Sequence, residues 1–298
     1  MGARTAPTPP SRPSVSGARA AGYRAEIGFD DDTGLSPAGD SAWHGHVAPG
    51  WETPRGPLGG YVMAIVLRAM QEAVGDESRQ PRSFTVHFLR PPHEGEVTVR
   101  PVLERAGRNL STASARLEQD GKLIALALCA FSGPWPGPLL TEGTMPDVQP
   151  PDPDRPPPLA PDPDRPAPSF VEQVTMQPRF GEAMFSGAEQ GLAGGWLALQ
   201  EARPIDALTL CVLADLWFPA PWPRLDALAP APTIDLTVHF RAPLPLDDVE
   251  LLGRFRSTQV RDGFFEEDGE LWSPDGTLVA QSRQLGLLLV DQAQGAGG

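Results

Sequence analysis

The sequence predicts an α+β protein made of two copies of one unit, in each of which an antiparallel sheet wraps around a central helix. The tetrapeptide "TVHF" occurs twice, at residues 85–88 and 237–240. "DGKLIALAL" follows the first copy and "DGTLVAQSR" the second, at nearly equal intervals. Two matched landmarks in the same order indicate that one unit has been duplicated.

A proline-rich stretch at residues 134–168 separates the two copies and contains "PDPDRP" twice. Such a composition is extended and polyproline-like and cannot bury a core, so we expect a linker. A docking site for a proline-binding partner is the alternative. The expected organisation is a disordered tail at 1–21, a first unit at 22–133, this linker, a second unit at 169–291 and a short tail at 292–298.

Each copy contains one strongly apolar helix. The first is predicted at 59–73, where apolar residues occur almost all the way round, which is typical of a buried helix. These residues are Val62, Met63, Ile65, Val66, Leu67 and Met70. The second helix is predicted at 206–218, with Asp206 as its N-cap.

Strands are predicted after each helix. "SFTVHFL" and "TIDLTVHF" alternate strictly between apolar and polar residues, as half-buried strands do. Asp-Gly pairs in "LEQDGKLIAL" and "LWSPDGTLVAQ" are strong hairpin signals. Because an apolar helix must be covered on nearly every side, we expect one antiparallel sheet to curl around each helix.

Composition narrows the function classes. The chain has 298 residues, 40% of them hydrophobic, and a net charge of −14, which repels nucleic acid. We find no apolar run long enough to span a bilayer and no secretory signal, so we expect a cytoplasmic protein. Cys129 and Cys211 lie in apolar runs and are expected to be buried thiols. "HGH" at 44–46 lacks a third ligand, so no metal is expected.

Certain segments, in their order and duplication, resemble a known family. They are "GPLGGYVMAIVLRAM" and "SFTVHFLRPP" in the first copy and "VLADLWF", "TIDLTVHFR" and "GTLVAQSRQLG" in the second. Together they resemble the double-hotdog acyl-CoA thioesterases. The resemblance implies two tandem hotdog units that hydrolyse acyl-CoA to free acid and CoA without a cofactor. It also implies a water-activating trio of Asp215, Thr233 and Gln284. Leu236 stands where several relatives carry histidine.

The residue types of this trio suit thioester hydrolysis. The reaction needs a base for the attacking water and a donor for the carbonyl oxygen. Asp215 has apolar neighbours, which should raise its pKa toward neutrality and make it a base. Thr233 and Gln284 can hold the water without adding charge. Alternatively, Asp215 is a helix-end carboxylate satisfied by backbone amides or by Arg224.

The candidate for binding the oxyanion is the helix start in "GPLGGYV". The N–H groups of Gly60 and Tyr61 would point outward from the positive end of the helix dipole. The alternative is that Gly59 and Gly60 only let the helix enter a crowded sheet. Because no acid precedes Glu72 in the first helix, we expect one active site per chain.

Arg90, Arg105 and Arg108 are candidates for binding the phosphates of CoA, against the alternative of ordinary surface arginines. Two rival functions remain open: a non-catalytic acyl-CoA or acyl-carrier binding protein, and a hotdog dehydratase of a biosynthetic pathway. No G-x-S-x-G motif is present, which argues against an α/β-hydrolase. The outer sheet face predicts a homodimer or higher homo-oligomer, and acyl-CoA is the expected partner.

Overall fold

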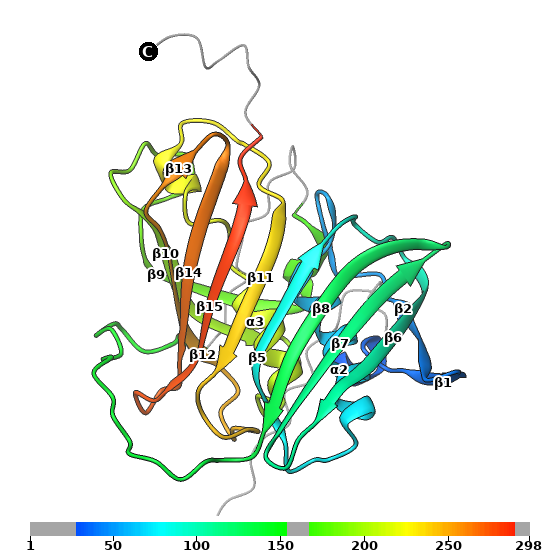
Figure 1. The fold of residues 1–298 in the computed structure, drawn as a ribbon. Helices are drawn as coiled ribbons and strands as arrows, with labels where there is room; N and C mark the ends of the chain where they lie inside the picture. The colour runs from blue at the N-terminus through cyan, green and yellow to red at the C-terminus, as the bar shows by residue number, and fades with distance from the viewer. Residues whose placement is uncertain (1–27, 154–166, 290–298) are drawn as a thin grey trace, which may run out of the picture.

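A computed structural model describes residues 28–153 and 167–289 of the chain (Figure 1). The tails predicted at 1–21 and 292–298 lie outside the described residues. So do 22–27, 154–166 and 290–291, which belong to the predicted units and linker.

The first half of the described chain runs from a short helix to a set of long strands. In order, it comprises α1 (Phe29–Asp32), β1 (Ser36–Gly39), β2 (Ala42–Val47), β3 (Glu52–Thr53), β4 (Gly56–Pro57), α2 (Gly59–Val74), β5 (Gln80–Phe88), β6 (Gly95–Ala106), β7 (Leu110–Gln119) and β8 (Lys122–Ser132).

The second half repeats this plan with a shorter helix. It comprises the 3₁₀ turn η1 (Ser169–Glu172), β9 (Val174–Phe180), β10 (Gly191–Leu199), α3 (Ala207–Ala214), the 3₁₀ turn η2 (Trp222–Arg224), β11 (Thr233–Phe240), β12 (Leu251–Ser257), β13 (Val260–Arg261), β14 (Phe264–Trp272) and β15 (Leu278–Leu287).

Apart from β3 and β4, which pair with each other, the described strands form one large antiparallel sheet whose order reads almost the same from its centre in both directions. From β5 outward the neighbours are β8, β7, β6, β2 and β1, and from β11 outward they are β15, β14, β12, β10 and β9. The two "TVHF" segments pair at the centre, where Thr85 lies opposite Thr237 and their hydroxyl oxygens are 2.9 Å apart. The repeated tetrapeptide therefore forms the junction between the two halves (Figure 1).

Helices α2 and α3 lie together on one face of this sheet (Figure 1). α2 is buried along most of its length, as its apolar pattern predicts, and ends where Gly75 adopts a left-handed conformation. α3 is capped by Asp206, whose side chain accepts the Thr209 N–H at 2.8 Å. It ends at Ala214 rather than at 218, because a run of prolines beginning at Pro219 cannot continue a helix.

The fold class is therefore confirmed in its coarser form only. The hotdog-like combination of antiparallel sheet and helices is present, but sheet predominates over helix more than an α+β description suggests.

The described part of the proline-rich segment packs against the second half. Residues 134–152 form no helix or strand. Met145 and Val148 nevertheless contact a cluster of Trp196, Leu252 and Trp272. Leu197, Leu251 and Leu271, the neighbours of these residues along their strands, belong to the main core, so the cluster lies on the opposite, outer face of the sheet. This segment therefore covers part of the face that the sequence assigned to oligomer contacts.

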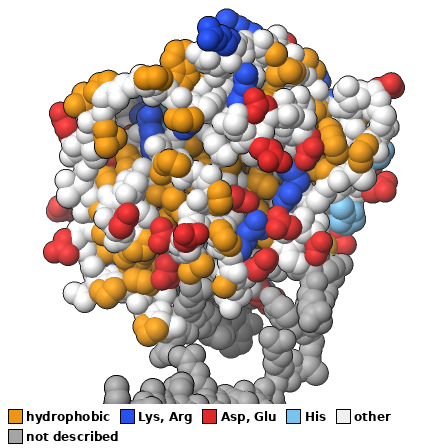
Figure 2. All heavy atoms as spheres, turned by 90° about the horizontal axis from the view of Figure 1, so that it is seen from below, with side chains coloured by type: hydrophobic (Ala, Val, Ile, Leu, Met, Phe, Trp, Pro, Cys, Tyr) orange, Lys and Arg blue, Asp and Glu red, His pale blue; other side chains and the backbone are white. Residues whose placement is uncertain are grey.

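Two predictions from composition can be followed in the structure. Cys129 and Cys211 are buried free thiols, as expected. None of the helices in the described ranges combines the length and apolarity that crossing a membrane requires. Acidic and basic side chains are intermixed on the face shown in Figure 2.

Candidate active site

Asp215 lies where the end of α3 meets the start of α2. Its Oδ2 accepts the N–H of Gly60 at 2.7 Å. The absence of side chains at the helix start permits this approach, since a Cβ added to Gly59 would lie 2.8 Å from Oδ2 and one added to Gly60 would lie 2.4 Å from the Cys211 carbonyl oxygen. The carboxylate is thus held at the positive end of the α2 dipole.

The environment of Asp215 shifts the pKa of its carboxyl group toward neutrality. Burial raises its pKa to about 7, although the N–H groups of Gly60 and Gly59 partly offset this effect. No cation contributes to the shift. The residue as a whole has intermediate exposure, whereas its carboxyl group is buried. A carboxylate with such a pKa takes up and releases a proton near neutrality.

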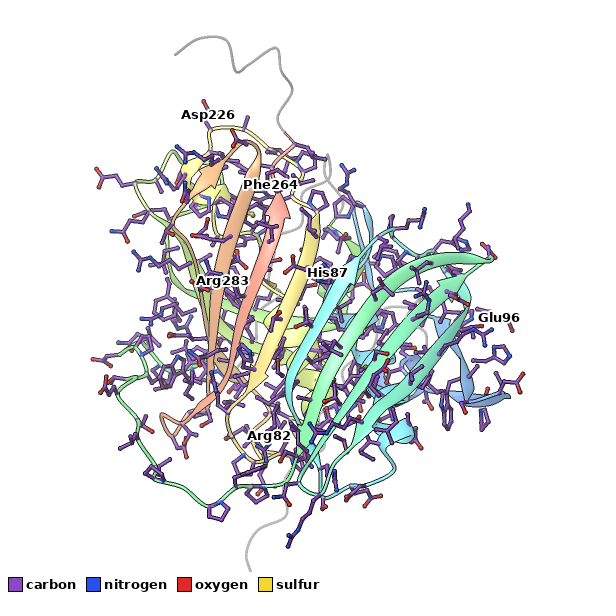
Figure 3. The ribbon with its side chains drawn as sticks, viewed as in Figure 1. Arg82, His87, Glu96, Asp226, Phe264 and Arg283 are labelled. Atoms are coloured by element: carbon purple, nitrogen blue, oxygen red, sulfur yellow. The ribbon has the colours of Figure 1, made fainter. Side chains whose placement is uncertain are left out.

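Thr233 and Gln284 come from the neighbouring strands β11 and β15. The Thr233 hydroxyl donates to Gln284 Oε1 at 2.8 Å. The pairing of the two strands is irregular between Thr233 and Asp235, which sets the start of β11 diagonally across from Gln284. Gln284 is buried on the helix side of the sheet, whereas the adjacent Arg283 is exposed on the outer face (Figure 3).

A residue that our sequence reasoning missed completes this group. Glu267 of β14 is only 3% exposed. Its Oε1 accepts Gln284 Nε2–H at 2.6 Å and its Oε2 accepts the Ala220 N–H at 2.5 Å. The sequence offers no clear signal for it, because "FFEEDGELW" does not alternate between apolar and polar residues. Burial alternates along the folded strand and places Glu267 on the same face as Phe265 and Leu271.

The structure thus brings the predicted trio together as two linked groups. Asp215 is bound to the start of α2, while Thr233, Gln284 and Glu267 form a continuous hydrogen-bonded chain. The charge of Asp215 helps raise the pKa of Glu267 to about 7, so the two carboxyl groups are within electrostatic reach of each other. Among the described residues, Asp215 makes no direct hydrogen bond to Thr233 or Gln284.

The expected oxyanion donors already have partners, which corrects the simple form of that prediction. The Gly60 N–H is bound to Asp215. The Tyr61 N–H donates to the Leu58 carbonyl oxygen, and its hydroxyl accepts the Ala48 N–H and donates to the Asp32 carbonyl oxygen. Tyr61 is fully buried and stacks on Trp51 at 4.7 Å, so it anchors the helix start within the core. It is therefore not placed to touch a substrate.

Two models of one protein family match the chain. The "Acyl-CoA thioesterase N-terminal domain" matches residues 47–132, and the "Acyl-CoA thioesterase C-terminal domain" matches residues 153–288. A solved hot dog fold protein of unknown function from Alicyclobacillus acidocaldarius is 30% identical, covers 88% of this chain and 98% of its own, and superimposes with a TM-score of 0.78.

The chain belongs to the double-hotdog acyl-CoA thioesterase family. It is accordingly an enzyme that hydrolyses acyl-CoA thioesters.

Further solved structures agree with this family assignment. A putative thioesterase II from Thermobifida fusca is 25% identical over 90% of this chain and 99% of its own, with a TM-score of 0.73. An acyl-CoA thioesterase II from Mycobacterium marinum is 18% identical over 89% and 98%, with a TM-score of 0.69, and shows the shared fold. Among curated proteins, none matches the chain.

The three arginines proposed for CoA are dispersed in this thioesterase. Arg90 follows β5 at the end where Phe88 faces Gly59, and its guanidinium donates to the Leu123 carbonyl oxygen at 2.8 Å. Arg105 is level with Ser83 near the other end of β5 and three strands away, which places it roughly 20 Å from Phe88. Arg108 lies beyond Arg105 in the β6–β7 turn. Of the three arginines, Arg90 alone lies at the end of the sheet near Gly59 and Asp215.

The other end of the helix pair carries different chemistry. A cleft of about 400 Å³ there is lined by Arg68, Arg203 and Asp206 among others. Arg68 and Arg203 both pair with Asp30, and Arg203 also pairs with Asp206. This charge-balanced cluster does not reproduce the unpaired carboxylate at Asp215. The described residues hold no group of three side chains suited to a metal, and His44 and His46 are exposed.

Proposed function

We propose that this thioesterase activates its water with Asp215 as general base and positions that water with Thr233 and Gln284. The observation that carries the proposal is the state of Asp215, whose carboxyl group is buried without a cation and has its pKa raised to about 7. A base with such a pKa is about half ionised at pH 7 and accepts a proton readily when ionised.

The hydrogen bonds give the attacking water defined partners. Because the Thr233 hydroxyl donates to Gln284, its oxygen lone pairs remain able to accept a hydrogen from water. Gln284 Nε2 has a second N–H beyond the one bound to Glu267, and this can donate to the water oxygen. Asp215 then accepts the proton as the water oxygen attacks the carbonyl carbon. Collapse of the tetrahedral intermediate breaks the carbon–sulfur bond, and the CoA thiolate takes a proton from Asp215.

The Gly60 N–H serves the developing oxyanion within the same step. It binds the Asp215 carboxylate in the free enzyme. Once Asp215 has accepted a proton, it is a weaker acceptor, because hydrogen bonds to an ionised oxygen are about twice as strong as those between neutral groups. The Gly60 N–H can then donate its hydrogen bond to the substrate carbonyl oxygen instead, as that oxygen gains charge. In this scheme Tyr61 only fixes the helix start.

Several finer expectations belong to the same proposal. The two halves act as tandem hotdog units that share one active site per chain. At the end of the helix pair opposite Asp215, the Arg68 and Arg203 cluster occupies the place where a second site would lie. Arg90 is the remaining candidate for a CoA phosphate. We place the enzyme in the cytoplasm and in fatty acid metabolism. We also expect a homo-oligomer through the outer face of β5–β8, where Leu126 and Leu128 are exposed and no described linker residue packs.

Thiol release from a panel of acyl-CoAs tests the proposal. We expect Asp215→Asn to lower kcat by at least ~100-fold, the range of a lost general base. Asp226→Asn is the matched control, since Asp226 is exposed in the loop after η2 (Figure 3), and it should retain full activity. Full activity of Asp215→Asn would refute its role as base. No thiol release by the wild type would favour the binding-protein reading, and conversion of an enoyl or hydroxyacyl substrate instead would favour a dehydratase.

A further inference from the structure

Glu267 is an unusual residue for its position. It lies on the helix-facing side of β14 between Phe265 and Leu271, each about 1% exposed. A buried carboxylate is normally paired with a cation. Here the charged groups that act on Glu267 are both acidic, Asp215 and Glu266. A purely structural role would not require a charge at this position, because an apolar side chain would fill the site at lower cost.

Both oxygens of Glu267 have specific donors. Oε2 accepts the Ala220 N–H from the loop that follows Asp215, and Oε1 accepts Gln284 Nε2–H. Glu267 and Gln284 are direct cross-strand partners in the register of β14 and β15, so their side chains are held side by side. An ionised carboxylate can only accept hydrogen bonds. It therefore obliges Gln284 to turn its N–H groups toward β14.

This orientation determines which group donates and which accepts along the whole hydrogen-bonded series from Glu267 to Thr233. With Nε2 facing Glu267, Gln284 presents Oε1 to Thr233, and the threonine hydroxyl must donate to it. The lone pairs of Thr233 are then left for the water. If the glutamine amide were reversed, its N–H would donate to Thr233 and the hydroxyl hydrogen would point elsewhere.

We propose that Glu267 is a positioning residue for hydrolysis, which fixes the amide of Gln284 and through it the hydroxyl of Thr233. The inference rests on the proposed roles of Thr233 and Gln284 at the water. It adds that the carboxylate must be ionised, since a protonated Glu267 would donate to Gln284 Oε1 and reverse the chain. Besides the backbone N–H of Ala220 and the Gln284 amide, the groups facing Glu267 are the carboxylates of Asp215 and Glu266.

Glu267→Gln tests this role with almost no change in shape. Ala220 and Gln284 donate to different oxygens of Glu267, and the new side chain carries an NH2 donor in place of one of them, so it cannot accept both hydrogen bonds in this geometry. We expect kcat to fall roughly 10- to 100-fold with KM changed less than about threefold, the cost of a misdirected buried hydrogen bond. Glu270→Gln is the matched control on the same strand: its partly exposed side chain bonds to Arg254, and its kcat should equal that of wild type. Wild-type kcat in Glu267→Gln would overturn the proposal.

A double-mutant cycle distinguishes positioning from a general structural effect. If Glu267 acts through Gln284, adding Glu267→Gln to Gln284→Ala should lower kcat by less than about twofold further. Fully additive losses would refute action through Gln284. A large loss in Asp215→Asn alongside an unaffected Glu267→Gln would reject this inference alone, whereas an active Asp215→Asn would reject the proposed function itself.

The dependence of wild-type kcat/KM on pH provides a readout that does not require a variant to fold well. Burial and the charge of Asp215 raise the pKa of Glu267 to about 7, close to that of Asp215. If both must be ionised, log(kcat/KM) of the wild type should fall below neutrality with a slope approaching two. Glu267→Gln should reduce this slope to one. A wild-type slope of one would contradict the proposal.

Discussion

The ionised form of Asp215 should cost the enzyme stability, and Asp215→Asn should recover it. Burial raises the pKa of this carboxyl from 3.8 to about 7. The folded protein therefore binds more protons than the unfolded chain between these two pH values, and stability is lost as the pH rises through that window. Asparagine has nearly the same shape and keeps an oxygen that can accept the Gly60 N–H, but it carries no charge to desolvate.

The size of the effect follows from the shift. Three pKa units at about 1.4 kcal/mol each give an upper limit of about 4 kcal/mol at pH 8. Asp215 is partly exposed, so solvent screening reduces this to about 1–3 kcal/mol. At about 2–4 °C per kcal/mol for a domain of this size, we expect Asp215→Asn to raise the melting temperature at pH 8 by roughly 2–10 °C.

The assay is thermal unfolding of wild type and variant at pH 8 and at pH 5.5. At pH 5.5, roughly midway between the pKa values of the unfolded and folded states, the wild type has lost only about half of this stability, so the gain in melting temperature should be about half of that at pH 8. The Asp226→Asn control should show no such pH-dependent gain. If the variant is equally stable or less stable than wild type at both pH values, folding does not disfavour the ionised form of Asp215. The argument for its role as a base would then fail.

Three further predictions follow from the contacts around the site. Thr233→Val should lower kcat about 10-fold or more because the water loses a partner, while Thr237→Val on the outer face should leave kcat unchanged. Gly60→Ala should lower the free energy of unfolding by about 1–3 kcal/mol, because its methyl group would lie 2.4 Å from the Cys211 carbonyl oxygen. Gly137→Ala, with nothing within 4 Å, is its control in a denaturant titration. Dialysis against a strong chelator should leave kcat unchanged, and a loss restored by added metal would contradict the assignment of the chemistry to these side chains.

Much of the fold could be predicted because duplication and periodicity are local signals. The alternation of "SFTVHFL" and "TIDLTVHF" correctly placed β5 and β11, and the Asp-Gly pairs correctly placed two hairpins. The early end of α3 at Ala214 is a consequence of the downstream prolines. The packing of Met145 and Val148 on the outer sheet face could not be foreseen, because proline content says nothing of what lies opposite an extended chain.

For the candidate site, the sequence could propose residue types but not the connections between them. Asp215, Thr233 and Gln284 could be named from the order of motifs. However, the partner of the Gly60 N–H depends on how α2 and α3 cross, which sequence does not specify. Glu267 lies in a segment without apolar alternation, and its importance emerges only when β14 pairs with β15 and places it beside Gln284.

The most direct test is a crystal structure of the enzyme with a non-hydrolysable acyl-CoA analogue in which a methylene group separates the sulfur from the carbonyl. We predict that the analogue's carbonyl carbon will lie about 3–3.5 Å from a water bound by Asp215, Thr233 and Gln284. A carbonyl located instead in the cleft lined by Arg68 and Arg203, with Asp215 out of contact with that water, would contradict the proposed mechanism.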